Sequence, residues 1–159
     1  MSYGAPLELI LREVVRPALQ TAGIWSEARE QIVLGTGAVE SGYRWLVQIG
    51  GGPALGWWQC ERATHLDLWD NWLKYRKDTL PARLRILCEG IERDGALIAH
   101  PMYAAAICGA HYLRARGALP AAGDAQGQAE YHKLRYNGPG ATDPAESVIH
   151  FKNAIEACK

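Results

Sequence analysis

One glutamate has the sequence environment that acid catalysis requires. Glu40 follows Ala38 and Val39 at the end of a run that predicts a mainly apolar helix. An apolar surround disfavours the charged form of a carboxyl, and the negative end of a helix dipole acts in the same direction. A carboxylic acid that keeps its proton near neutral pH can protonate the leaving oxygen of a glycosidic bond. Glu40 is therefore the candidate general acid; the alternative is a solvated carboxylate at a helix end.

Three aromatic residues near Glu40 could serve the same reaction. Trp45, Trp57 and Trp58 follow Glu40 closely, and we expect them to line a dry cleft and stack on sugar faces. Ser41 directly follows Glu40, where a serine can cap the end of the helix. Asn137 precedes Gly138, an order that is typical of a turn.

Four short blocks of sequence follow one another in a fixed order. They are Glu40-Ser41, then Gly56-Trp57-Trp58-Gln59 with Thr64, then Gly109-Ala110-His111-Tyr112-Leu113, and finally Tyr136-Asn137-Gly138. Together they resemble the goose-type lysozyme and soluble lytic transglycosylase superfamily. The pattern of that family is Glu-Ser, Gly-Leu-Met-Gln with a threonine five residues later, Gly-x-x-Tyr-Leu, and Ala-Tyr-Asn-x-Gly. The resemblance covers about residues 32–156.

The resemblance implies a lysozyme-like fold, peptidoglycan glycan strands as substrate, and no cofactor or metal. It implies that Glu40 is catalytic, and that the residues which bind or orient substrate are Ser41, Gln59, Tyr136, Asn137, Trp57 and Trp58. Two departures concern the sugar subsites. Trp57-Trp58 stands where the family has Leu-Met, and Arg135 precedes Tyr136 where the family has alanine, with a compressed glycine turn after it.

The number of carboxylates decides the type of reaction. Two-carboxylate glycosidases place a second Asp or Glu about 5–9.5 Å from the acid, but no acidic residue lies between Glu40 and Glu61. This gap favours the single-glutamate mechanism of lytic transglycosylases, which cleaves the bond between N-acetylmuramic acid and N-acetylglucosamine and leaves 1,6-anhydro products. Approach of Asp67 or Asp70 in the fold would instead favour a hydrolysing muramidase.

Composition narrows the class of protein. Seventeen basic and seventeen acidic residues balance, which argues against nucleic-acid binding, since that usually needs a basic face. No apolar run approaches the roughly 18 residues of a transmembrane helix, and the first residues lack the features of a signal peptide. We therefore expect synthesis in a host cytoplasm, no membrane partner, and action on peptidoglycan in the periplasm or cell wall.

A compact chain without an export signal or wall-binding module favours a bacteriophage lysin, either an endolysin or a lysin of the virion tail. The alternative is a structural tail or baseplate protein that keeps the lysozyme-like fold with little or no activity. We expect phage tail or baseplate proteins as further partners.

The four cysteines are far apart and form no CxxC pair. Zinc sites usually carry ligands two to four residues apart, so we expect buried free thiols rather than a metal site.

The pattern of apolar residues predicts one mainly helical domain over residues 1–159, with six or seven helices and at most a small β-hairpin. Pro17 should break or kink the first helix just before it. Ser26 and Asp143-Pro144 are expected to begin helices. The expected helical ranges are 5–22, 26–40, 60–73, 78–94, 100–117, a short helix ending near 136, and 143 to the end.

Overall fold

The computed structural model describes residues 2–139 and 142–159, and it confirms a mainly helical single domain. The helices are α1 (Leu7–Ile10), α2 (Arg16–Ala22), α3 (Glu27–Glu40), α4 (Arg62–Asn71), α5 (Leu80–Leu87), α6 (Ala96–Ala99), α7 (Pro101–Arg114), α8 (Ala125–His132) and α9 (Pro144–Ala157). The two strands are β1 (Ala54–Leu55) and β2 (Cys60–Glu61). If α1 and α2 count as one helix and the single turn α6 is left out, the described residues contain seven helices, in agreement with the expected number.

Helix starts follow the capping signals in the sequence. The side chain of Ser26 accepts a hydrogen bond from the backbone N–H of Arg29, and that of Asp143 accepts one from Ala145. Both oxygens satisfy backbone donors that have no partner within the helix. The predicted starts of α3 and α9 are therefore confirmed.

Proline in the first long helix is accommodated without a break. A π-helical turn, Leu11–Val15, joins α1 to α2 and ends two residues before Pro17. A proline has no N–H and its ring crowds the carbonyl four residues earlier; the wider turn relieves both conflicts. The irregularity lies where it was expected, as a local change of helix type.

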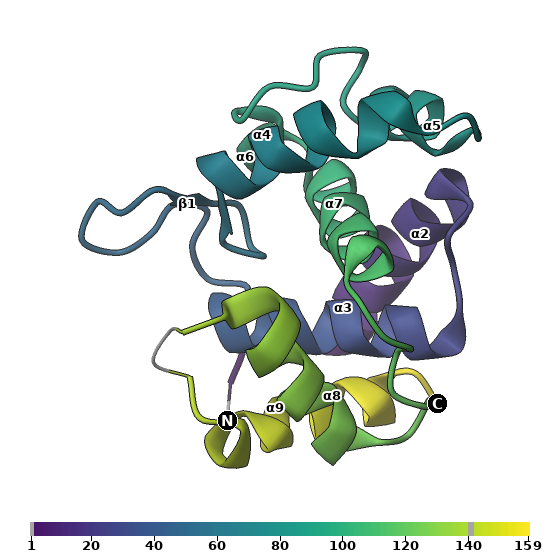
Figure 1. Ribbon diagram of the computed structural model, residues 1–159. Helices are drawn as coiled ribbons and strands as arrows, with labels where there is room; N and C mark the ends of the chain where they lie inside the picture. The colour runs from purple at the N-terminus through teal and green to yellow at the C-terminus, as the bar shows by residue number, and fades with distance from the viewer. Residues whose placement is uncertain (1, 140–141) are drawn as a thin grey trace.

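Helix α7 runs through the middle of the molecule, between α4, α5 and α6 on one side and α3, α8 and α9 on the other (Figure 1). Most of α7 is buried, including Tyr103, Ile107 and Tyr112. Thr36 of α3 shares a 2.8 Å hydrogen bond with the hydroxyl of Tyr112. This contact fixes α3, and with it Glu40, against the central helix.

Helix α3 also packs closely on α9. An added Cβ at Gly35 would come within 2.3 Å of the ring of Phe151, so a larger residue there would push α9 away. Phe151 is completely buried. The C-terminal helix therefore supports the underside of the helix that carries Glu40.

Beyond α3 the chain forms an extended loop and a minimal antiparallel hairpin, in which Ala54 pairs with Glu61 and Leu55 with Cys60. Gly56 lies in this hairpin with φ +74°, and an added Cβ would be 2.4 Å from the carbonyl oxygen of Leu97. The absence of a side chain at Gly56 therefore permits the close approach of two backbone segments.

Several helix boundaries were predicted wrongly. The helix expected from Cys60 begins at Arg62, after strand β2, and the helix expected to reach Gly117 ends at Arg114. The helix after Asp78 ends at Leu87 rather than near Asp94. Glu89 and Gly90 both have positive φ, which turns the chain out of the helix, and Ile91 is 53% exposed rather than part of a buried stripe. Within the described part of the chain, no helix combines the length and the apolar character needed to cross a bilayer.

Candidate active site

A cleft of about 770 Å³ lies beside the end of α3. Its walls come from α3, from the loop and hairpin that follow, from the start of α4, from α7, and from the segment after α8. The residues that line it are Glu40, Trp45, Gln48, Ile49, Ala54, Gln59, Cys60, Glu61, Thr64, His111, Tyr136, Asn137, Gly138 and Pro139. Four of the seven site residues expected from the sequence are therefore brought together here: Glu40, Gln59, Tyr136 and Asn137.

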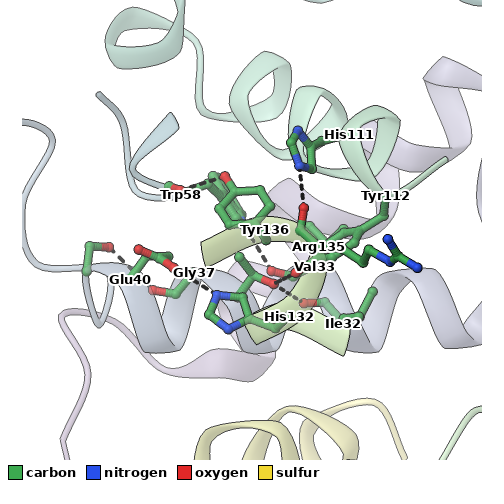
Figure 2. Close-up of polar contacts among 12 residues, drawn as sticks. Ile32, Val33, Gly37, Glu40, Trp58, His111, Tyr112, His132, Arg135 and Tyr136 are labelled. Carbon is green, nitrogen blue, oxygen red and sulfur yellow. Dashed lines mark hydrogen bonds and ion pairs between the residues drawn. The ribbon is translucent and has the colours of Figure 1, made fainter. Parts of the chain in front are cut away.

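Glu40 is the last residue of α3, and 15% of its side chain is exposed. Its Oε1 lies 2.8 Å from Nε2 of His132, which comes from the end of α8 (Figure 2). The carboxyl thus has one side on the cleft and one side on a buried ring. Such a group can exchange a proton with a substrate without moving far, because its orientation is already fixed.

His132 itself is fully buried. Its ring lies nearly parallel to that of Tyr136, with centroids 5.7 Å apart, and it also contacts Phe151. The other ring nitrogen, Nδ1, is buried and has no hydrogen-bond partner among the described residues. Within the described part of the chain, the hydrogen bond to Glu40 is therefore the one polar contact of the His132 ring.

Gln59 enters the cleft from the turn that precedes β2. Its backbone has φ +47°, a left-handed conformation that is costly for a residue with a side chain. The side-chain Nε2 donates a 2.8 Å hydrogen bond to the carbonyl of Gly56. The amide oxygen takes no part in this bond. The strained turn thus holds an amide in the cleft that contains Glu40.

Tyr136 and Asn137 come from a π-helical turn, Lys133–Asn137, that continues α8. The Tyr136 hydroxyl donates a 2.7 Å hydrogen bond to the backbone oxygen of Trp58, and burial holds the pKa of this phenol well above its ordinary value. Oδ1 of Asn137 is buried without a partner among the described residues. An unpaired buried acceptor is costly, and the residue Asn137 itself lines the cleft.

Trp58 does not face the cleft, so the expectation that it stacks on sugars is wrong. It is 1% exposed, and its indole N–H donates a 2.8 Å hydrogen bond to the carbonyl of Val33. Trp57 is half-buried, is not among the lining residues, and packs edge-on against Tyr43. Of the three tryptophans expected in the cleft, Trp45 is the one that lines it. Helix α3 and the hairpin loop need an apolar filler between them, and Trp58 takes that place.

Ser41 is 1% exposed and lies outside the lining of the cleft. Its hydroxyl donates a 2.7 Å hydrogen bond to the carbonyl of Trp57 and accepts one from the backbone N–H of Tyr43. Direct contact with substrate is therefore ruled out for Ser41 in this structure. It ties the end of α3 to the hairpin loop and orients Glu40 through the backbone.

His111, near the end of α7, makes a specific polar contact with the segment that follows α8. Nε2 lies 2.8 Å from the carbonyl oxygen of Arg135, so this nitrogen carries the hydrogen, since a carbonyl can only accept. Burial lowers the pKa of the ring, which favours the neutral form. A neutral ring whose Nε2–H is engaged has its lone pair on Nδ1, and His111 is one of the lining residues.

Sequence reasoning missed two of the site residues. His132 lies four positions before Tyr136, a spacing that places both on one helical face, so the signal was present. Glu61 lines the cleft from β2. Neither Asp67 nor Asp70 lines it; Asp67 instead pairs with Arg114 and Asn71.

Thiols offer no alternative chemistry in the cleft. Cys60 lines it, but burial raises the pKa of its thiol to about 12, so the reactive thiolate is scarce at neutral pH. All four cysteines are free. Over residues 2–139 and 142–159, no three metal-ligating side chains gather into a site.

Comparison of this chain with models of protein families, with curated proteins and with solved structures gives no match. Kinship with the goose-type lysozymes and lytic transglycosylases stays a prediction from the four sequence blocks.

Proposed function

We propose that the chain is a peptidoglycan lytic transglycosylase that cleaves the β-1,4 bond between N-acetylmuramic acid and N-acetylglucosamine. The observation that carries the proposal is the meeting of Glu40, Gln59, Tyr136 and Asn137 at one cleft. These residues come from three segments that are far apart in the chain, and the family pattern selects the same residues. A chance likeness of short motifs gives no reason for them to share a cleft.

Glu40 performs the proton transfers in this proposal. In the first step its carboxylic acid protonates the glycosidic oxygen, and the bond from C1 of N-acetylmuramic acid to that oxygen breaks. The electron pair of the bond leaves with N-acetylglucosamine, and positive charge develops on the muramic ring.

In the second step the C6 hydroxyl of the same muramic residue attacks C1. The Glu40 carboxylate accepts the hydroxyl proton, and a 1,6-anhydro ring closes without water. The acid is restored in its starting form, so one carboxyl serves as acid and then as base. Gln59 and Asn137 offer amide groups that can hold the sugar in place for both steps.

Hydrolysis is the second candidate reaction, and the position of Glu61 favours it. Its carboxylate lines the same cleft as Glu40 and has no hydrogen-bond or ion-pair partner among the described residues. A second carboxylate in the cleft can activate a water molecule or stabilise the oxocarbenium ion. The ratio of anhydro to reducing muramic ends separates the two reactions.

The biological setting is part of the proposal. We infer a bacteriophage lysin, either an endolysin or a component of the virion tail, because the sequence resembles a lysozyme-like catalytic domain. In that setting peptidoglycan strands are the substrate.

A turbidity assay on purified peptidoglycan tests the function. The wild-type chain should clear the suspension, and Glu40→Gln should lower the rate of clearing by several orders of magnitude. Glu130→Gln is the matched control, because Glu130 is exposed on α8 and its side chain pairs with Gln126 outside the cleft. Absence of clearing at any wild-type concentration would instead favour a structural tail or baseplate protein.

A further inference from the structure

The contact between Glu40 and His132 raises the question of which carboxyl oxygen performs the acid chemistry. Oε1 of Glu40 and Nε2 of His132 lie 2.8 Å apart (Figure 2), and one proton must lie between these two atoms. Either Nε2–H donates to Oε1, or a protonated Oε1 donates to Nε2. The two arrangements make opposite predictions about catalysis, because the second places the acid proton on the buried side of the carboxyl.

The surroundings of the ring favour the first arrangement. If Nε2 lacks a hydrogen, the neutral ring must carry it on Nδ1, which is buried and has no acceptor among the described residues. A buried N–H without an acceptor costs about 1–3 kcal/mol. With the hydrogen on Nε2, Nδ1 is instead an acceptor without a partner, and its lone pair lies among aromatic rings. Buried donors without a partner are rarer in proteins than buried acceptors without one.

We propose that His132 is a positioning residue for Glu40, whose Nε2–H holds Oε1 as an acceptor and thereby makes Oε2 the oxygen that carries the acid proton. The inference rests on the proposed function and specifies how its acid is set up. The histidine side of the carboxyl is closed, since His132 is 0% exposed. The 15% of the Glu40 side chain that remains accessible is what can meet substrate.

The same hydrogen bond assists the first proton transfer of the reaction. After Glu40 gives up its proton, the carboxylate is stabilised by a donor already in position, and a hydrogen bond to a charged group is stronger than one between neutral groups. The stacking of His132 on Tyr136 keeps the donor from turning away. His132 touches neither the sugar nor the reacting atoms, so its effect is exerted through Glu40.

Kinetics on soluble glycan strands test the positioning role with two variants. His132→Phe keeps a ring against Tyr136 and Phe151 but removes the donor, and kcat should fall about 100-fold with KM nearly unchanged. His132→Gln places an amide N–H the same number of bonds from the backbone, and its kcat should be at least about tenfold higher than that of His132→Phe. Wild-type kcat in folded His132→Phe, or no recovery in His132→Gln, would overturn the proposal.

A control variant separates positioning from folding. His65 is another buried histidine, hydrogen-bonded to Asp94 and Tyr103 outside the cleft. His65→Phe should lower the melting temperature while the folded fraction keeps its kcat. If His65→Phe and His132→Phe lose kcat in proportion to their melting temperatures alone, His132 has no positioning role.

A measurement that does not need activity distinguishes failure of this inference from failure of the proposed function. Nitrogen-15 NMR of the His132 ring should show the hydrogen on Nε2, with a shift of that resonance in Glu40→Ala. A hydrogen on Nδ1 overturns the inference whether or not the protein clears peptidoglycan. A hydrogen on Nε2 in a protein that clears nothing upholds the arrangement of the pair and rejects the enzyme.

Discussion

The hydroxyl of Tyr136 donates a 2.7 Å hydrogen bond to the backbone oxygen of Trp58, across 78 positions of the chain. This bond joins the segment after α8 to the hairpin loop. Gln59 is the next residue after the bonded carbonyl, so the contact also fixes the turn that brings Gln59 into the cleft. Two elements that share no local contact thereby form a single wall.

Tyr136→Phe should therefore weaken the fold as well as the reaction. Loss of one partner leaves the Trp58 carbonyl unpaired, and we expect the free energy of unfolding to fall by about 1–3 kcal/mol. Turnover should fall about tenfold to a thousandfold, since the turn that holds Gln59 loosens. Urea unfolding and steady-state kinetics measure the two effects; wild-type values in both would show that the bond is dispensable.

Gln59→Ala should separate these effects. The side chain makes its hydrogen bond to the nearby carbonyl of Gly56, so we expect little change in the melting temperature. Turnover should fall about tenfold to a thousandfold, the range for loss of one positioned polar group at a charged transition state. A variant that keeps full turnover would remove Gln59 from the site.

Trp45 and Trp58 should have different roles, the first in binding substrate and the second in packing the core. Trp45→Ala should raise KM about tenfold through loss of a face on which sugar can stack, with stability largely kept. Trp58→Phe should lower the free energy of unfolding by about 2 kcal/mol, because it removes buried surface and the bond to Val33, and should leave KM unchanged. The reverse result for the pair would mean that Trp58 reaches substrate.

Stability should fall as the pH drops from 7.5 to 5. Burial lowers the pKa of His111 below the ordinary 6.5, so the unfolded chain takes up this proton first. Protonation of the unfolded state then favours unfolding. The loss of stability begins as the pH falls through the pKa of His111 in the unfolded chain, and it levels off below the pKa of His111 in the folded chain. Asp67 and Asp78 have lowered pKa values, so their contribution is lost at more acidic pH.

His111→Gln tests this assignment through urea unfolding at the two pH values. The variant should show a smaller loss of stability between pH 7.5 and 5 than the wild type, since one histidine with a lowered pKa is gone. His150, whose pKa is also lowered by burial, should account for part of the remaining slope. An unchanged slope would mean that His111 is not responsible.

Much of the fold could be predicted because its signals are local. Ser26 and Asp143 cap their helices through neighbouring backbone groups, and the irregular turn before Pro17 follows from the ring of that residue. The direction of Trp57 and Trp58 could not be predicted in this way. An aromatic side chain in a glycine-rich loop can face a core or a cleft with equal local propensity, and the packing of α3 against the hairpin decides between them.

The site divides in the same manner. Glu40 was selected by its local sequence environment, and Gln59, Tyr136 and Asn137 by the resemblance to a known family; all four line one cleft. The pairing of Glu40 with His132 spans 92 positions and depends on how α8 lies across α3, which no local pattern encodes. The place of Glu61 in the cleft could not be predicted, because it depends on the direction of the two-residue strand β2.

Mass spectrometry of peptidoglycan digested by the wild-type chain tests the central claim most directly. If Glu40 acts as acid and then as base, the muramic ends should be 1,6-anhydro products, lighter than hydrolysed ends by one water, and they should disappear in Glu40→Gln. Glu61→Gln should leave them in place. A digest dominated by reducible muramic ends that are lost in Glu61→Gln would contradict the account and make the protein a two-carboxylate hydrolase.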